Sequence, residues 1–152
     1  MTPAAVTVRS ATREDMVALN RICNEFIVSS HISFDVDPWT DTARTAWFDE
    51  RVASGHITLV AELDGKVLGG AWSAPWRTKA AYERSAETTV MLEPSVHGSG
   101  VGEHLYGALV TALADSGLHR CYAVIALPNE PSIRLHSKLG FTEIGTLDEV
   151  GF

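Results

Sequence analysis

The sequence of 152 residues contains little cysteine and no long apolar stretch. Its two cysteines, Cys23 and Cys121, lie far apart and form no Cys-x-x-Cys motif, which excludes a disulfide framework and a zinc ribbon. No apolar run reaches the length of a membrane span, and no signal peptide is recognisable. We therefore expect a cytoplasmic protein without a membrane partner.

Positive charge is also scarce. Twelve lysines and arginines stand against 19 aspartates and glutamates, so the formal net charge is −7. This balance argues against nucleic acid and anionic membranes as partners. Any anion that binds must be held by local backbone dipoles, because the overall field would repel it.

The sequence also does not predict a metal site or a set of residues for nucleophilic catalysis. The histidines His31, His56, His104 and His119 lack the spacing of metal ligands, so no metal site is predicted. The residues also do not suggest a Ser-His-Asp or Cys-His set, which argues against a covalent enzyme intermediate.

The residues that are present predict a single α/β (α+β) domain over 1–152. A chain of this length suits one domain with its own core, and 45% hydrophobic and 20% charged residues are ordinary for a globular protein. Asp64-Gly65 between two apolar runs is a strong hairpin signal. The predicted strands are Val6–Arg9, Ile57–Leu63, Lys66–Ser73, Ser85–Leu92, Cys121–Leu127 (read as covered on both faces) and Phe141–Val150. The predicted helices begin after Thr12 and span about Asp41–Ala53, Val101–Gly117 and Glu130–Leu139.

A glycine-rich loop joins the strand ending at Leu92 to the helix beginning near Val101. Glycines allow positive φ and let amide N–H groups converge, and a helix N-terminus adds further unpaired N–H groups. Such a loop can cradle a pyrophosphate, although alternating glycines alone also fit an ordinary tight turn. The loop lacks the Lys-Ser or Lys-Thr of a P-loop, and its G-x-G-x-G spacing differs from the dinucleotide fingerprint. We expect a different phosphorylated cofactor.

Several motifs, distributed in order over essentially the whole chain, resemble those of a known protein family. They are His97-Gly98-Ser99-Gly100-Val101-Gly102, Ser33-Phe34-Asp35 before Pro38, the segment Pro75–Tyr82, Glu87 within its strand, and the segment Ser132–Phe141. In these the chain resembles the GNAT superfamily of N-acetyltransferases, and within it the phosphinothricin/methionine sulfone acetyltransferase group. His97 departs from the usual Arg or Gln. Relatives usually continue beyond Glu149-Val150-Gly151 with a further strand, so we expect that strand to be missing or its place to be covered by a partner subunit.

The resemblance implies a mixed, mostly antiparallel sheet that splays open between two parallel strands and is flanked by helices. It implies acetyl-CoA as co-substrate and a homodimer. The residues expected to hold acetyl-CoA are Val90, Met91 and Leu92 for the pantetheine arm, Gly98, Ser99, Gly100, Val101, Gly102 and Glu103 for the pyrophosphate, and Asn129. Asn129 is equally suited to cap the helix that follows it.

Glu87 interrupts an otherwise uncharged strand, and burying a carboxylate without a purpose costs stability. The resemblance assigns it as the general base that takes a proton from the acceptor ammonium, directly or through water. The alternative is a strand-edge glutamate that faces solvent or pairs with Arg77 or Lys79. His136 occupies the position of the family's proton donor, and its alternative is a packed or surface histidine.

Arg77, Lys79 and Tyr82 form a cationic and aromatic cluster suited to a carboxylate. Phe34 is expected to line the same site, together with Glu87, Thr88 and Thr89. The cluster favours a small amino-acid-like amine as acceptor, and the resemblance implies one of the phosphinothricin, methionine sulfoximine or methionine sulfone type. Two alternatives remain open: another amine such as a protein N-terminus, and a non-catalytic acyl-CoA-binding module.

Overall fold

A computed structural model describes residues 5–151, and the two ends of the predicted domain, residues 1–4 and 152, lie outside the described residues. Its strands are β1 (Thr7–Ser10), β2 (Thr58–Leu63), β3 (Lys66–Pro75), β4 (Ser85–Leu92) and β5 (Arg120–Tyr122). Its helices are α1 (Met16–Ser29), α2 (Asp41–Ala53), α3 (Val101–Asp115) and α4 (Glu130–Lys138), with short 3-10 turns η1 (Arg13–Asp15), η2 (Ala80–Tyr82) and η3 (Pro94–Val96). Within the described part of the chain, no helix is both long enough and apolar enough to cross a bilayer.

The strands form one mixed sheet in the order β1-β2-β3-β4-β5. All neighbouring pairs are antiparallel except β4 and β5, which run parallel. The predicted hairpin is confirmed: Leu63 pairs with Lys66, and both turn residues, Asp64 and Gly65, have positive φ. Two consecutive positive φ values match the twist of a tight hairpin.

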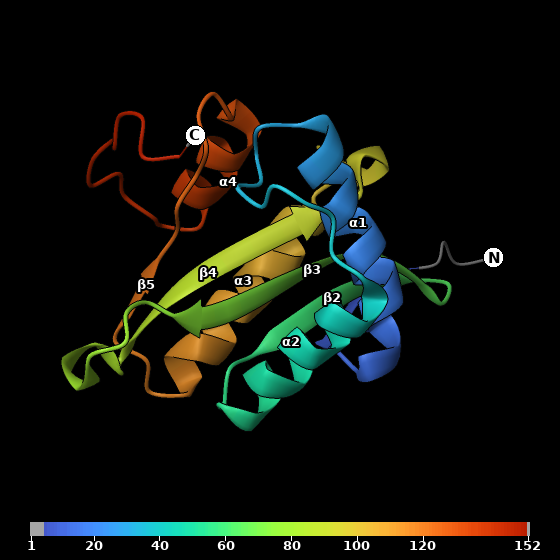
Figure 1. Ribbon diagram of the computed structural model, residues 1–152, viewed down its shortest axis with the longest axis horizontal. Helices are drawn as coiled ribbons and strands as arrows, with labels where there is room; N and C mark the ends of the chain where they lie inside the picture. The colour runs from blue at the N-terminus through green and yellow to red at the C-terminus, as the bar shows by residue number, and fades with distance from the viewer. Residues whose placement is uncertain (1–4, 152) are drawn as a thin grey trace.

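Helices cover both faces of the sheet (Figure 1). Alternate side chains of the strands point to opposite faces, so each face has its own core. On one face α1 and α2 bury Met16, Leu19 and Phe48 against Trp72 of β3. The other face is covered by α3, and the core residues there are Leu59, Ala61, Ala71, Val101, Leu105, Tyr106, Leu109 and Leu113.

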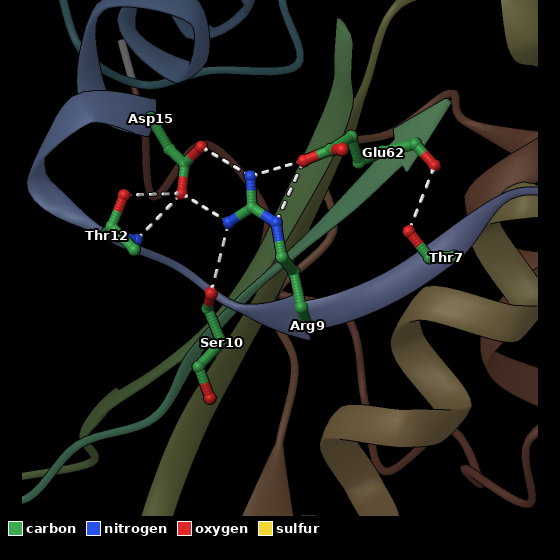
Figure 2. A network of polar contacts seen from close by, with 6 residues as sticks. All are labelled: Thr7, Arg9, Ser10, Thr12, Asp15 and Glu62. Carbon is green, nitrogen blue, oxygen red and sulfur yellow. Dashed lines mark hydrogen bonds and ion pairs between the residues drawn. The ribbon is translucent and has the colours of Figure 1, made fainter. Parts of the chain in front are cut away.

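A polar network joins β1, β2 and the start of α1 (Figure 2). The Arg9 guanidinium donates two hydrogen bonds to Asp15, at 2.7 and 2.9 Å, and its Nε donates to Glu62 at 2.9 Å. Asp15 also accepts the backbone N–H of Thr12 at 2.7 Å, which caps the helical segment as the sequence predicts. Burial alone would raise the pKa of Asp15, but the hydrogen bonds from Arg9 and Thr12 outweigh it, and the pKa is lowered.

Two asparagines of α1 fix the end of the connection to α2. The Asn24 side chain accepts the backbone N–H of Trp39 at 2.9 Å and donates to the carbonyl of the same residue at 2.8 Å. Asn20 donates to that carbonyl as well, at 2.9 Å. The connection carrying Phe34 is therefore held at its C-terminal end by paired side chains of the preceding helix.

Two predicted strands are wrong in part or in whole. The apolar run Cys121–Leu127 is a strand only to Tyr122, and Val124 and Leu127 are exposed instead of covered on both faces. The segment Phe141–Val150 forms no strand. A strand persists only where a neighbour accepts its backbone hydrogen bonds, and within residues 5–151 no strand pairs with residues 123–127 or with residues 141–150.

Candidate active site

The site begins where β4 and β5 separate. Their parallel pairing covers three residue pairs, Ser85 with Arg120, Ala86 with Cys121 and Glu87 with Tyr122. Beyond Glu87, β4 continues to Leu92, and only β3 pairs with it in the described part of the chain. One edge of its C-terminal half is therefore free of strand pairing.

The register with β3 shows which peptide groups lie on that edge. The N–H of Glu93 donates to the carbonyl of Leu68 at 2.8 Å, so alternate residues back along β4 also direct their peptide groups to β3. Met91 is one of these. Val90 and Leu92 direct their N–H and C=O groups to the free edge.

The glycine-rich loop follows this edge directly. Gly98 and Gly100 adopt φ values of +75° and +88°, and the space where a Cβ would lie is empty at both. The N–H groups of Gly98 and Gly100 and of the first helical residues 101–103 donate to no acceptor within residues 5–151. The loop therefore offers a set of unpaired donors at the positive end of the α3 dipole, as expected for an anion site.

The third glycine has a different role. A Cβ on Gly102 would lie 2.9 Å from the Leu92 side chain and 3.4 Å from that of Leu135, so this glycine lets α3 pack closely on β4 and α4. The next residue, Glu103, is exposed, and its carboxylate pairs with Lys138 of α4 at 2.6 Å. Ser99 bonds back to the carbonyl of Val96 through its backbone N–H and its hydroxyl.

His97, the position that departs from the family pattern, is turned toward β4. Its Nε2 lies 3.2 Å from the carbonyl oxygen of Leu92, which can only accept, so His97 donates. Its ring stacks on Phe26 of α1, with ring centroids 6.2 Å apart. The side chain therefore anchors the loop to the strand and to α1.

Glu87 lies inside the sheet and is the last residue of β4 that pairs with β5. It pairs with Ala74 of β3 on one side and Tyr122 of β5 on the other, so it is not on an edge strand. Within residues 5–151 its carboxylate, which is half-buried, forms no ion pair with Arg77, Lys79 or any other cation.

The neighbouring threonines lie on opposite faces of β4. Thr89 shares the face of Glu87, toward α1 and α2. Thr88 is buried on the α3 face, where its hydroxyl contacts Tyr106 at 2.7 Å and donates to the carbonyl of Tyr122 at 3.3 Å. That hydroxyl is fully engaged by the protein itself.

Three of the residues expected to bind the acceptor come together. Arg77, Lys79 and Tyr82, with Thr78, line a depression of about 320 Å³ in the connection between β3 and β4. The Trp76 ring stacks on Tyr122 with ring centroids 4.5 Å apart. This contact holds the connection beside the place where β4 and β5 separate. The depression precedes β4 and the glycine loop follows it, so the two lie at opposite ends of a strand that is roughly 23 Å long at about 3.3 Å per residue.

Phe34 lies elsewhere, on the connection between α1 and α2, and its side chain is 59% exposed. Gly151 packs so closely against its ring that a Cβ there would overlap it. From the same connection, His31 Nε2 donates to the carbonyl of Pro128 at 2.7 Å. The connection is thus joined to the segments that follow β5 and α4.

His136 is buried in α4 against the rings of Tyr106 and Phe141. Its Nδ1 lies 2.7 Å from the carbonyl of Ser132, so Nδ1 carries a proton and donates. Burial lowers the pKa of His136 below its usual value, and the Ser132 hydrogen bond opposes this only in part. Burial therefore favours the neutral imidazole, in which Nδ1 carries the proton and Nε2 carries none.

Asn129 caps α4, because its Oδ1 accepts the N–H of Ser132 at 3.3 Å. The capping alternative for this residue is thus present in the structure. The described residues contain no cluster of three His, Cys, Asp or Glu side chains able to hold a metal ion.

Sequence reasoning missed Glu93, which lies between the end of β4 and the glycine loop. Its buried carboxylate accepts hydrogen bonds from Lys66 and Arg21, and these lower its pKa to about 2. A lone acidic residue before a proline carries no local signal for partners 27 and 72 positions away.

Comparison with known proteins agrees with this geometry. Residues 19–141 match the model of the acetyltransferase (GNAT) family. The chain is 42% identical to a phosphinothricin N-acetyltransferase of Streptomyces coelicolor, over 97% of this chain and 88% of the relative. It is 33% identical to an L-methionine sulfoximine/L-methionine sulfone acetyltransferase of Salmonella typhimurium, over 96% and 85%.

Solved structures share the fold. A GNAT superfamily phosphinothricin acetyltransferase from Sinorhizobium meliloti, solved in complex with acetyl-CoA, superposes with a TM-score of 0.93. It is 28% identical to this chain, and the match covers 97% of this chain and 80% of that one.

Proposed function

The chain belongs to the acetyltransferase (GNAT) family, as an acetyl-CoA-dependent acyltransferase, and we propose that it acetylates the amine of a small amino-acid-like acceptor. Phosphinothricin, methionine sulfoximine and methionine sulfone are the acceptors that the relatives' names suggest. Transfer is direct, from the thioester to the amine.

The observation that carries this proposal is the free edge of β4 leading into the glycine loop. A pantetheine arm is an extended chain with two amides, so it can pair with the peptide groups of Val90 and Leu92 as an added strand would. The pyrophosphate then reaches the unpaired amides of Gly98, Gly100 and the first turn of α3.

Glu87 supplies the base in this arrangement. An ammonium must lose a proton before its nitrogen can attack the thioester carbonyl, and Glu87 is the half-buried carboxylate beside the point where the acetyl group arrives. The C–N bond forms, the C–S bond breaks, and the thiolate must then gain a proton. The nitrogen loses its second proton as the C–N bond forms. His136, whose Nδ1 already donates to Ser132, accepts that proton on Nε2 and passes it from Nε2 to the thiolate.

The cationic depression supports an acceptor that carries a carboxylate. Arg77 and Lys79 offer two positive charges at the end of β4 nearest Glu87, and a guanidinium binds a carboxylate through paired hydrogen bonds. A polyamine would meet repulsion there, whereas a peptide N-terminus lacks the adjacent free carboxylate.

The experiment is a thiol-release assay with acetyl-CoA over a panel of acceptors. It should include phosphinothricin, methionine sulfoximine, methionine sulfone, ordinary amino acids, a peptide with a free N-terminus and a polyamine. Turnover confined to the free amino-acid analogues is the expected result. Turnover of the peptide or polyamine alone would replace the acceptor class, and binding of acetyl-CoA without any turnover would favour a non-catalytic module.

We propose in addition that two copies of the chain associate. Ile144, Leu147 and Val150, in the segment after α4, are largely exposed apolar side chains that a second copy would cover. Light scattering coupled to gel filtration measures this directly, and a monomeric mass at micromolar concentration would refute it.

A further inference from the structure

The connection from β4 to the glycine loop begins with a buried carboxylate. Glu93 is only 7% exposed, although the residues that follow it, Pro94 and Ser95, are exposed. Its backbone N–H still belongs to the sheet, through its hydrogen bond to Leu68. Glu93 is thus the last residue before the chain leaves the sheet.

Side chains from three different elements converge on this carboxylate. Oε1 accepts Arg21 of α1 at 2.8 Å, and Oε2 accepts Lys66 of β3 at 2.9 Å. Oε2 also accepts the hydroxyl of Ser95, from the connection itself, at 3.1 Å. A buried carboxylate that accepts three such hydrogen bonds is held in position, because moving away would leave its charge without partners.

The same connection is held to α1 a second time, by the stacking of His97 on Phe26. Between these two contacts the chain makes the η3 turn and arrives at Gly98. The segment that presents the unpaired amides is therefore fastened on its N-terminal side to α1 and β3.

We propose that Glu93 is a positioning residue for the glycine loop, and that its pairing with Arg21 and Lys66 holds Gly98 and Gly100 ready to receive the acetyl-CoA pyrophosphate. This inference rests on the proposed function. Arg21 and Lys66 then support the loop through Glu93. Their charges are paired with the Glu93 carboxylate and are not available to bind phosphate.

Simple charge reasoning predicts the opposite sign, which makes the proposal easy to test. Replacing Glu93 by glutamine removes a negative charge near the binding site of a polyanion, so charge alone would strengthen acetyl-CoA binding. In the positioning role the variant binds more weakly, because the amide NH₂ group faces a cation and the loop loses an anchor.

The experiment compares E93Q with D64N by calorimetric titration with acetyl-CoA. Asp64 is an exposed residue of the β2–β3 turn, lines the same surface depression as Arg21 and Lys66, and forms no ion pair within residues 5–151. It is therefore a control for the loss of one charge. Because the loop loses preorganisation, we expect E93Q to weaken acetyl-CoA binding roughly tenfold. We expect D64N to leave this binding nearly unchanged.

The acceptor side of the reaction separates positioning from general damage. E93Q should raise the KM for acetyl-CoA while leaving the KM for the acceptor and the pH profile of kcat in place. If E93Q binds acetyl-CoA as tightly as the wild type or more tightly, or if both KM values rise equally, the proposal is overturned.

A measurement without ligand keeps this test independent of the proposed function. Hydrogen exchange of the Val96, His97 and Ser99 amides, which donate to carbonyls within the connection, should be faster in E93Q than in the wild type, whether or not the protein binds acetyl-CoA. Unchanged exchange would overturn the positioning role, whereas a wild type that fails to bind acetyl-CoA would overturn only the proposed function.

Milder variants cover the case in which E93Q does not fold. Arg21→Met and Ser95→Ala each remove one hydrogen-bond donor to the Glu93 carboxylate. Both substitutions are at exposed positions. Each should accelerate exchange of the Val96, His97 and Ser99 amides and weaken acetyl-CoA binding by a smaller factor than E93Q does. If neither variant has an effect, the proposal is refuted.

Discussion

The hydroxyl groups of Thr88 and Tyr106 lie 2.7 Å apart in the interior, one residue beyond the last pairing of β4 with β5. Because the single hydroxyl proton of Thr88 goes to the carbonyl of Tyr122, the Tyr106 hydroxyl is the donor in this contact. Burial raises the pKa of Tyr106 to about 12, so the phenol keeps that proton at all ordinary pH values. The two side chains connect α3 to the point from which β4 and β5 diverge.

Thr88→Val should therefore destabilise the fold by about 1–3 kcal/mol, because it leaves the buried Tyr106 hydroxyl without a partner. Thr88→Ser, which keeps the hydroxyl, should recover most of the loss. Thr58→Val is the matched control, since the Thr58 hydroxyl is also buried but has no hydrogen-bond partner among the described residues. Urea unfolding of the three variants measures this, and equal losses for the two valine variants would contradict it.

Gly100→Val should weaken acetyl-CoA binding at least about tenfold, or about 1.4 kcal/mol, because the side chain enters the empty space in front of the loop amides. Gly117→Val is its control: Gly117 follows α3, has a similar φ of +85° and also has open space where a Cβ would lie. Both variants carry the same backbone strain. Calorimetry that finds equal affinities in the two would show that the loop does not hold the phosphates.

Glu87→Gln should lower kcat by about 10²–10⁴, the range expected when a general base is lost. The amide keeps the size of the side chain, so the affinity for acetyl-CoA should hardly change. Steady-state kinetics at pH 7 and at pH 9 test this. Near-native turnover in the variant would assign the base to another group.

Arg77→Ala should raise the KM for a carboxylate-bearing acceptor by about 10- to 150-fold, equivalent to a charge-assisted hydrogen bond of about 1.5–3 kcal/mol. A decarboxylated acceptor should react poorly with the wild type and lose little more in the variant, because the group that Arg77 binds is already absent. Equal losses for both acceptors would mean that Arg77 only shapes its loop.

Stability should fall as the pH drops below about 6.5. The pKa of His136 is lowered by burial and that of His56 is lowered for the same reason, with Arg51 adding to it. A folded-state pKa below the unfolded value of 6.5 means that the unfolded chain binds more protons in that range, so acid favours unfolding. Above pH 6.5 this stability is fully present.

The check is the free energy of unfolding at pH 7.5 and 5.5 in the wild type, in His136→Gln and in His104→Gln, an exposed control. The difference between the two pH values should shrink in His136→Gln but not vanish, because His56 remains. The same pH dependence in all three proteins would argue against a role for His136.

Local signals in the sequence were sufficient for most elements. Asp41–Ala53 and Ser85–Leu92 have the predicted bounds, and Asp64-Gly65 forms the predicted turn. In each case the information is local: a pattern along contiguous residues for the helix and the strand, and two adjacent residues that tolerate positive φ for the turn. The glycine loop was recognisable for the same reason.

Pairing between distant segments was not readable in this way. The apolar run after Cys121 resembles a buried strand, yet β5 ends at Tyr122 because the chain turns away from β4. Composition reports how apolar a segment is, whereas the presence of a neighbouring strand depends on the path of the whole chain.

The sequence by itself determined the order of most helices and strands, the glycine loop and the family, because those are properties of contiguous residues. Only the tertiary structure decided that Glu87 lies inside the sheet, that Thr88 faces α3 and that Glu93 joins Arg21 to Lys66. Each of these depends on which side chains meet across long separations in the chain. Burial and hydrogen-bond geometry, which give those residues their roles, exist only once the chain has folded.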